Sequence, residues 1–161
     1  RNRSHNFQFI VVGDGSERKH LEAYIRENNA GNYIRLLGEL VHDDAMAEIA
    51  SADIFCMPSH DEAFGVAYIE ALGLGKPIVG CFGEGPDSII RKCKCGILVN
   101  AGDKIELENA LEYLINNICV RREMGERGRK YVDQNFGWEK NASEYLRLFK
   151  RLVTVDDCTY L

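Results

Sequence analysis

The chain has 161 residues and a net charge of −5, with 45% hydrophobic and 28% charged residues. This length suits one domain with a sizeable core, and the composition is typical of a globular protein. The negative balance and the lack of a basic stripe argue against nucleic acid as the main partner. No apolar run is long enough to span a bilayer, and we expect no signal peptide at the N-terminus.

Alternating strand-like and helix-like segments follow one another along the chain. Short apolar runs bounded by turn residues predict strands, and segments with apolar residues at helical spacing lie between them. The predicted strands are 7–12, 33–37, 54–57, 78–81 and 96–99. The predicted helices are 16–28, 42–50, 66–74 and 88–92, and the chain is expected to be helical from about residue 104 onward.

Several helix ends carry signals of their own. Ser16 is expected to cap the first helix, and the turn 101–103 is expected to cap the helix that follows the last strand. Gly75 is expected to end the helix 66–74 in the left-handed conformation. The apolar residues near the C-terminus recur at helical spacing and are expected to pack in the core. These residues are Trp138, Ala142, Tyr145, Leu146, Phe149 and Val153.

Strands separated by helices predict parallel βαβ units. We therefore expect the α/β class: a three-layer, Rossmann-like domain with a parallel sheet, helices on both faces and a helical C-terminal tail. Residues 1–161 are expected to form this single domain. Ligands of such sheets bind at the carboxyl ends of the strands, where the glycine-rich and polar loops 13–16, 38–42, 58–65 and 82–87 fall.

The predicted helix 66–74 is apolar on every side except for Glu70. Such a helix is expected to be buried, and a lone buried carboxylate then needs a hydrogen-bonding partner. The free N–H groups of residues 64–67 make the start of this helix an anion site. His60, in the preceding loop, is a candidate ligand contact or a solvated loop residue. Gly13 begins a turn that lacks the third glycine of a dinucleotide fingerprint, so ligand contact and a plain turn are equally open.

The six cysteines do not form the dense framework of a small secreted protein. We therefore expect reduced thiols and a cytoplasmic protein. Cys93 and Cys95 do not have the spacing of a zinc site, and the four histidines show no metal-ligand spacing.

The segment 62–70 contains two glutamates, Glu62 and Glu70, separated by seven residues around Phe-Gly. This pattern resembles the signature of the group 1 retaining glycosyltransferases of the GT-B fold. The resemblance extends along nearly the whole chain, in the order of the family's motifs. The matching segments are 11–15, 36–38, 52–59, 75–79, 85–87, 96–99, 122–125 and 136–138.

The resemblance implies roles for these residues. Glu62 would approach hydroxyls of the donor sugar as the catalytic-site glutamate, and Glu70 would bind the ribose hydroxyls. The loop near Leu37 and Gly38 would lie against the base. The backbone amides that would hold the diphosphate belong to Phe64, Gly65, Val66 and Ala67. The implied reaction is retaining transfer of a hexosyl unit from a nucleotide-diphosphate sugar. The N–H groups and the helix dipole would stabilise the charge on the leaving phosphate, and no metal or other cofactor is expected.

The resemblance also implies that this chain is the C-terminal, donor-binding half of such an enzyme and is inactive alone. Its partners would be a nucleotide-sugar donor and, through an absent N-terminal domain, an acceptor glycan or lipid-linked sugar. Peripheral membrane association of the full-length protein stays open. The family's Arg and Lys that grip the diphosphate have no counterpart, because Arg1 and Arg3 lie too close to the first strand.

Two other classes stay open. One is a related sugar-nucleotide enzyme of the same fold, such as an epimerase, although Phe-Gly between spaced glutamates favours the transferase. The other is a non-catalytic, receiver-like or partner-binding domain. A receiver domain needs an acidic cluster after the first strand and an aspartate after the third, whereas this chain offers only Asp14 and then Met57-Pro58-Ser59.

Overall fold

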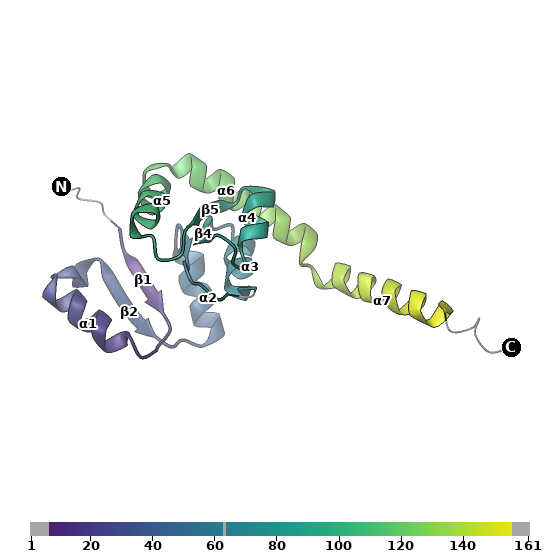
Figure 1. Cartoon of the computed structure of the whole chain (residues 1–161), viewed down its shortest axis with the longest axis horizontal. Helices are drawn as coiled ribbons and strands as arrows, with labels where there is room; N and C mark the ends of the chain where they lie inside the picture. The colour runs from purple at the N-terminus through teal and green to yellow at the C-terminus, as the bar shows by residue number, and fades with distance from the viewer. Residues whose placement is uncertain (1–6, 63, 156–161) are drawn as a thin grey trace. The chain divides into compact units, whose positions relative to one another are not determined.

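The computed structural model describes residues 7–62 and 64–155 of the chain. The chain forms two compact units, Arg1–Glu48 and Ile49–Leu161. Figure 1 labels the helices and strands in chain order. No helix in the described part of the chain combines the length and the apolar character needed to cross a membrane.

The first unit contains a pair of parallel strands. β1 (Phe9–Val12) and β2 (Ile34–Gly38) pair in parallel, and α1 (Arg18–Glu27) with the 3₁₀ turn η1 (Ala30–Asn32) connects them. Parallel pairing across a helical connection is the predicted βαβ unit. The last helix to begin in this unit is α2 (His42–Ser51), which runs past residue 48.

The predicted cap of α1 is wrong. The helix begins at Arg18, its N-cap residue is Glu17, and no side chain caps it. The reason is local, because the N–H of Arg18 donates to the carbonyl of Gly15 at 3.1 Å and closes a turn, and the carboxylate of Asp14 lies 3.4 Å from the Arg18 guanidinium. These contacts hold the chain in a turn beyond Ser16, so the helix starts two residues later than predicted.

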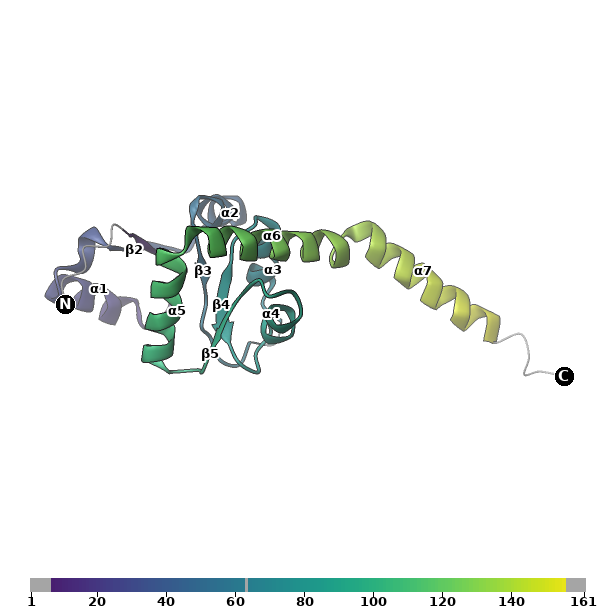
Figure 2. The same cartoon turned by 90° about the horizontal axis from the view of Figure 1, so that it is seen from above.

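The second unit is built on three parallel strands in the order β3 (Phe55–Cys56), β4 (Ile78–Cys81) and β5 (Gly96–Val99). Two helices connect them, α3 (Val66–Gly73) and α4 (Asp87–Cys93). Figures 1 and 2 show α3 and α4 on one side of these strands and α5 (Lys104–Asn116) on the other. The α/β class, the parallel pairing and the helical layers on both faces are therefore confirmed.

The core of this unit has two parts because successive side chains of a strand point to opposite faces. On one face, Ile78 packs with Tyr68 and Leu72 of α3. On the other face, Val79 packs with Leu114 of α5. All four residues of β4 are buried, as expected for the middle strand of a sheet covered on both faces.

The C-terminal tail is helical, as predicted. After α5 come α6 (Ile118–Asn135) and α7 (Trp138–Val155). Asp103 caps α5 as expected, since its carboxylate accepts the N–H groups of Ile105 and Glu106 at 3.0 and 2.9 Å. Gly75 also has its predicted role: at φ +72° it ends α3, and its N–H donates to the carbonyl of Leu72 at 2.9 Å.

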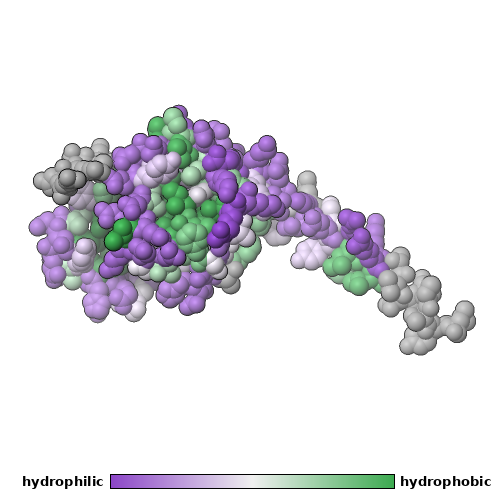
Figure 3. All heavy atoms as spheres, turned by 45° about the horizontal axis from the view of Figure 1, so that its top comes forward, coloured by the Kyte–Doolittle hydropathy of each residue, from purple (hydrophilic) through white to green (hydrophobic). Residues whose placement is uncertain are grey.

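The expectation that the apolar residues of α7 pack in the core is wrong for the described residues. Trp138 is 88% exposed, Phe149 57% and Val153 71%. Figure 3 shows hydrophobic residues at the surface of this helix. The periodicity identified one apolar face of a helix correctly, but a periodic pattern carries no information about what covers that face.

Candidate functional site

Two loops of the second unit meet at one edge of its sheet. Residues 57–65 follow β3 and residues 82–86 follow β4, and these strands are parallel neighbours. The N–H of Gly85 donates to the carbonyl of Glu62 at 2.9 Å, and the N–H of Glu62 donates to a carboxylate oxygen of Glu84 at 2.7 Å. The structure thus brings together two of the loops predicted at the ligand edge.

The start of α3 lies at this edge. Its N-cap residue is Gly65, in the left-handed conformation at φ +70°, and no side chain caps it. A Cβ on Gly65 would lie 2.8 Å from a ring carbon of Tyr68, so both backbone conformation and space require glycine. Phe64 and Val66, on either side, are 52% and 60% exposed. An uncapped helix start with exposed flanks is suited to an anion.

The two predicted glutamates occupy different settings. Glu62 lies in the loop before α3, half-buried, with a carboxylate oxygen 3.4 Å from the N–H of Phe64. Glu70 lies on α3 and is also half-buried, as is Ala67. The expectation that Glu70 is a buried carboxylate is therefore wrong. The fully buried residues of this short helix are Tyr68, Ala71 and Leu72, and Glu70 is not among them.

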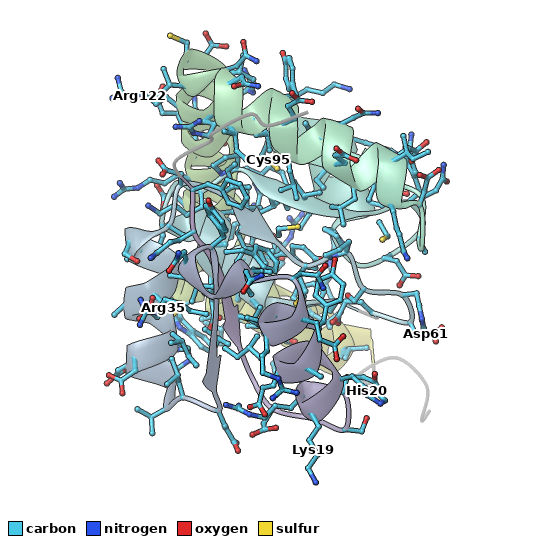
Figure 4. All side chains as sticks on the ribbon, turned by 90° about the vertical axis from the view of Figure 1, so that its left-hand side faces the viewer. Lys19, His20, Arg35, Asp61, Cys95 and Arg122 are labelled. Atoms are coloured by element: carbon cyan, nitrogen blue, oxygen red, sulfur yellow. The ribbon has the colours of Figure 1, made fainter. Side chains whose placement is uncertain are left out.

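His60 is exposed, and its ring nitrogen Nδ1 lies 3.1 Å from the carboxylate of Asp61. Asp61 has φ +62°, a conformation that non-glycine residues rarely adopt. Figure 4 labels Asp61, whose side chain points outward from its loop. The structure places His60 in the loop before α3, with its ring beside the carboxylate of Asp61.

The remaining predicted residues belong to the first unit. Gly13 directly follows β1, and Gly38 is the last residue of β2. The two lie side by side, and the N–H of Gly13 donates to the carbonyl of Gly38 at 2.7 Å. Both have positive φ, +122° and +77°. Leu37 precedes Gly38 on β2 and is half-buried. A pocket of about 610 Å³ in this unit is lined by residues of α1, η1 and β2, and its lining contains none of these three residues.

A buried tyrosine supports the loop from below. The hydroxyl of Tyr68 donates to the carbonyl of Met57, at the start of the loop that carries Glu62. Burial raises the pKa of Tyr68 to about 12, so this hydroxyl keeps its proton and remains a donor. Tyr68 is fully buried and is not placed to exchange protons with a ligand.

The buried cysteines are unsuited to nucleophilic chemistry. Burial raises the pKa of the Cys56 thiol to about 11 and also raises that of Cys81, which leaves both as inert thiols. Cys95, labelled in Figure 4, is buried, and burial raises its pKa as well. Within residues 7–62 and 64–155, no group of three or more His, Cys, Asp or Glu side chains is arranged to hold a metal ion.

Sequence reasoning did not single out Glu84. Its loop was recognised as a candidate because it is rich in glycine, but the hydrogen bond from Glu62 joins residues that are 22 positions apart. A pairing of this kind leaves no local signal, since it depends on which strands become neighbours.

A family model described as "Glycosyl transferases group 1" matches residues 1–131. The relatives include a phosphatidyl-myo-inositol mannosyltransferase of Mycobacterium leprae, 30% identical over 150 residues, which are 91% of this chain and 38% of that protein. An uncharacterized glycosyltransferase of Methanocaldococcus jannaschii is 27% identical over 147 residues, 91% of this chain and 41% of that protein. The chain thus spans well under half the length of these curated relatives.

Solved structures show the same fold. Sucrose-phosphate synthase from Thermosynechococcus elongatus is similar with a TM-score of 0.79 and 27% identity, over 92% of this chain and 39% of that one. The HepE protein of Anabaena in complex with UDP-glucose is similar with a TM-score of 0.78 and 23% identity, over 89% of this chain and 41% of that one. The parallel α/β architecture, the spacing of Glu62 before α3 from Glu70 within it, and the match over residues 1–131 lead to one conclusion: the chain belongs to the group 1 glycosyl transferases.

Proposed function

We propose that this chain binds the nucleotide-diphosphate sugar of a hexosyltransferase that retains the anomeric configuration. The observation that carries the proposal is the uncapped start of α3 behind Gly65, with the carboxylate of Glu62 beside the N–H of Phe64. Similar proteins support it, since relatives are named as mannosyltransferases, one of them GDP-mannose-dependent, and a similar structure contains UDP-glucose.

In this proposal the diphosphate binds to the N–H groups of residues 64–67 at the positive end of the α3 dipole, and the carboxylate of Glu62 turns from the N–H of Phe64 toward the donor sugar. Glu70 accepts hydrogen bonds from the ribose hydroxyls, and Glu62 accepts them from the donor sugar. When the glycosidic bond to the diphosphate breaks, negative charge develops on the leaving phosphate. The fixed N–H groups stabilise that charge without a metal ion.

The acceptor, a glycan or a lipid-linked sugar, is proposed to bind to residues outside this chain. The coverage of the relatives supports this division, because the matching segment is about 36–41% of their length. The roles of Gly13, Leu37, Gly38 and His60 as donor contacts stay predictions from the sequence resemblance.

A thermal melt with UDP, GDP and ADP tests donor binding. A nucleotide present at 100 times its dissociation constant adds about 2.7 kcal/mol to the free energy of unfolding. For a chain of this size that corresponds to a rise of about 5–10 °C in melting temperature. The matched controls are uridine, guanosine and adenosine, which lack the diphosphate and are expected to give little shift at the same concentrations.

The Glu70→Gln variant should lose most of the shift produced by the active nucleotide, because an amide is a weaker acceptor for two ribose hydroxyls than a carboxylate. Glu108→Gln, at an exposed position of α5, is the control for the loss of one charge and should behave as the unaltered chain. The proposal fails when no diphosphate raises the melting temperature at millimolar concentration. An undiminished shift in Glu70→Gln would remove Glu70 from the site.

A further inference from the structure

The loop that follows β4 forms hydrogen bonds with both the N–H and the carbonyl of Glu62. The carboxylate of Glu84 accepts the N–H of Glu62 at 2.7 Å, and the N–H of Gly85 donates to the carbonyl of Glu62 at 2.9 Å. Two adjacent residues therefore satisfy both polar backbone groups of the proposed sugar-binding glutamate. The bond to Glu84 is charge-assisted and partly buried, which makes it stronger than a neutral, exposed one.

The two loops approach each other so closely that position 85 requires glycine. A Cβ on Gly85 would lie 2.5 Å from the carbonyl oxygen of Phe64 and 2.9 Å from its Cα. Real side chains essentially never approach backbone atoms that closely, so Gly85 allows the two loops to touch directly. The contact is made at Phe64, two residues before α3 begins, so the loop after β4 lies directly against the backbone of the loop that carries Glu62.

The loop that follows β4, residues 82–86, is held by contacts of its own. The carboxylate of Asp87 accepts the N–H of Gly83 at 2.7 Å and also binds the Arg91 guanidinium, and these two partners lower the pKa of Asp87. The same guanidinium lies 5.4 Å from the centre of the Phe82 ring. At the other end of the loop, Pro86 packs so tightly on β4 that a Cβ on Gly80 would lie 2.6 Å from its Cγ. Glu84 therefore projects from a rigid support.

We propose that Glu84 is a positioning residue for the donor site: its carboxylate fixes the peptide of Glu62, and thereby the spacing between the Glu62 side chain and the N–H groups at the start of α3. The inference rests on the proposed function, because it assigns Glu84 a role in the same site. Glu84 acts through the backbone of Glu62 and does not contact the donor. A loop held in its binding conformation before the ligand arrives binds more tightly than one that must be ordered on binding.

Three variants at this position separate the hydrogen bond from the charge. Glu84→Gln loses the charge but keeps an oxygen at the same reach, so it can still accept the N–H of Glu62. Glu84→Asp keeps the charge but is one methylene shorter, so its oxygen falls short. Glu84→Ala removes both. With UDP, GDP and ADP as probes, we expect Glu84→Asp and Glu84→Ala to weaken binding of the active nucleotide about tenfold or more, and Glu84→Gln to stay within about threefold.

Amide hydrogen exchange of Glu62 in the free chain provides a readout that needs no ligand. The N–H of Glu62 should exchange slowly in the unaltered chain and in Glu84→Gln, and faster in Glu84→Asp, with unchanged exchange in the strands of the core. Glu108→Ala, on the exposed side of α5, is the matched control and should change neither measurement.

The outcomes distinguish this inference from the proposed function. Absence of binding in the unaltered chain refutes the proposed function, and the exchange of the Glu62 amide still decides whether Glu84 holds that peptide. Binding in the unaltered chain with equal affinity in Glu84→Asp refutes the positioning role alone. Weak binding in Glu84→Gln together with full affinity in Glu84→Asp would likewise overturn it, because the charge and not the hydrogen bond would then be what matters.

Discussion

The close approach of α6 to the end of α3 depends on a single missing side chain. Gly125 is buried on α6, and a Cβ at this position would overlap the carbonyl oxygen of Gly75 and lie 2.8 Å from its carbonyl carbon. Gly75 is the left-handed residue that ends α3. Because both sides of this contact are backbone, neither can rotate away, and Gly125→Ala must push the two helices apart.

The cost can be set against the gain in helix propensity. Overpacking a well-packed site costs about 1–3 kcal/mol, and a backbone contact belongs at the upper end of that range. Alanine in a helix interior regains about 1 kcal/mol relative to glycine. The net loss is therefore about 2 kcal/mol, which corresponds to a fall of about 4–8 °C in melting temperature for a chain of this size.

Urea and thermal melts of the two proteins measure this difference. The matched control is Gly73→Ala on α3, where the nearest atom to an added Cβ is a methyl of Val132 at an ordinary 3.7 Å. This variant should be as stable as the unaltered chain or slightly more stable. Gly125→Ala melting at or above the temperature of the unaltered chain would refute the rigid close approach, since the helices would then separate at no cost.

Two further predictions concern the pH dependence and the helix caps. Stability should fall as the pH rises from about 10 to about 12: burial raises the pKa of Tyr68 from its usual 10.0 to about 12, so the unfolded chain loses this proton first, and the loss reaches about 3 kcal/mol at most. Urea melts across this range should show a smaller fall of the free energy of unfolding in Tyr68→Phe than in the unaltered chain. A fall as large as in the unaltered chain would contradict the assignment to Tyr68. Tyr145→Phe, at an exposed position, is the control. Asp103→Ala should lower the free energy of unfolding by about 1 kcal/mol because it removes the acceptor for two N–H groups of α5. Ser16→Ala should change it little because Ser16 caps no helix. Equal losses of stability in the two variants would show that the cap does not stabilise α5.

Local patterns were enough to place most of the elements. The strands predicted at 78–81 and 96–99 are found at those residues, and α3 ends where Gly75 indicated. These segments combine a continuous apolar run with clear turn residues on either side. The prediction at Ser16 failed because a backbone hydrogen bond from Arg18 to Gly15 closes a turn there and the helix begins after it, and residue type alone does not distinguish such a turn from a cap.

Burial was harder to predict than secondary structure. The apolar faces of α3 and α7 were both recognised, yet Val66 and Phe149 are exposed and Glu70 is only half-buried. A helix that is apolar in sequence is buried only where other elements cover it, and coverage depends on the arrangement of the whole unit. The free-energy cost of desolvating the Glu70 carboxylate in the folded chain is therefore smaller than its apolar neighbours in the sequence suggested.

The sequence by itself determined the family, the parallel α/β class and the segment that carries the candidate site. The class follows from the alternation of apolar runs and helical periodicity along the chain, and the site segment follows from the short spacing of Glu62 and Glu70 around Phe-Gly. Only the tertiary structure decided how that segment is held. The pairing of β3 with β4 brings Glu84 and Gly85 against the peptide of Glu62, and the packing of Tyr68 supports the same loop from the core. These contacts join residues far apart in the chain, and their existence depends on which strands become neighbours when the unit folds.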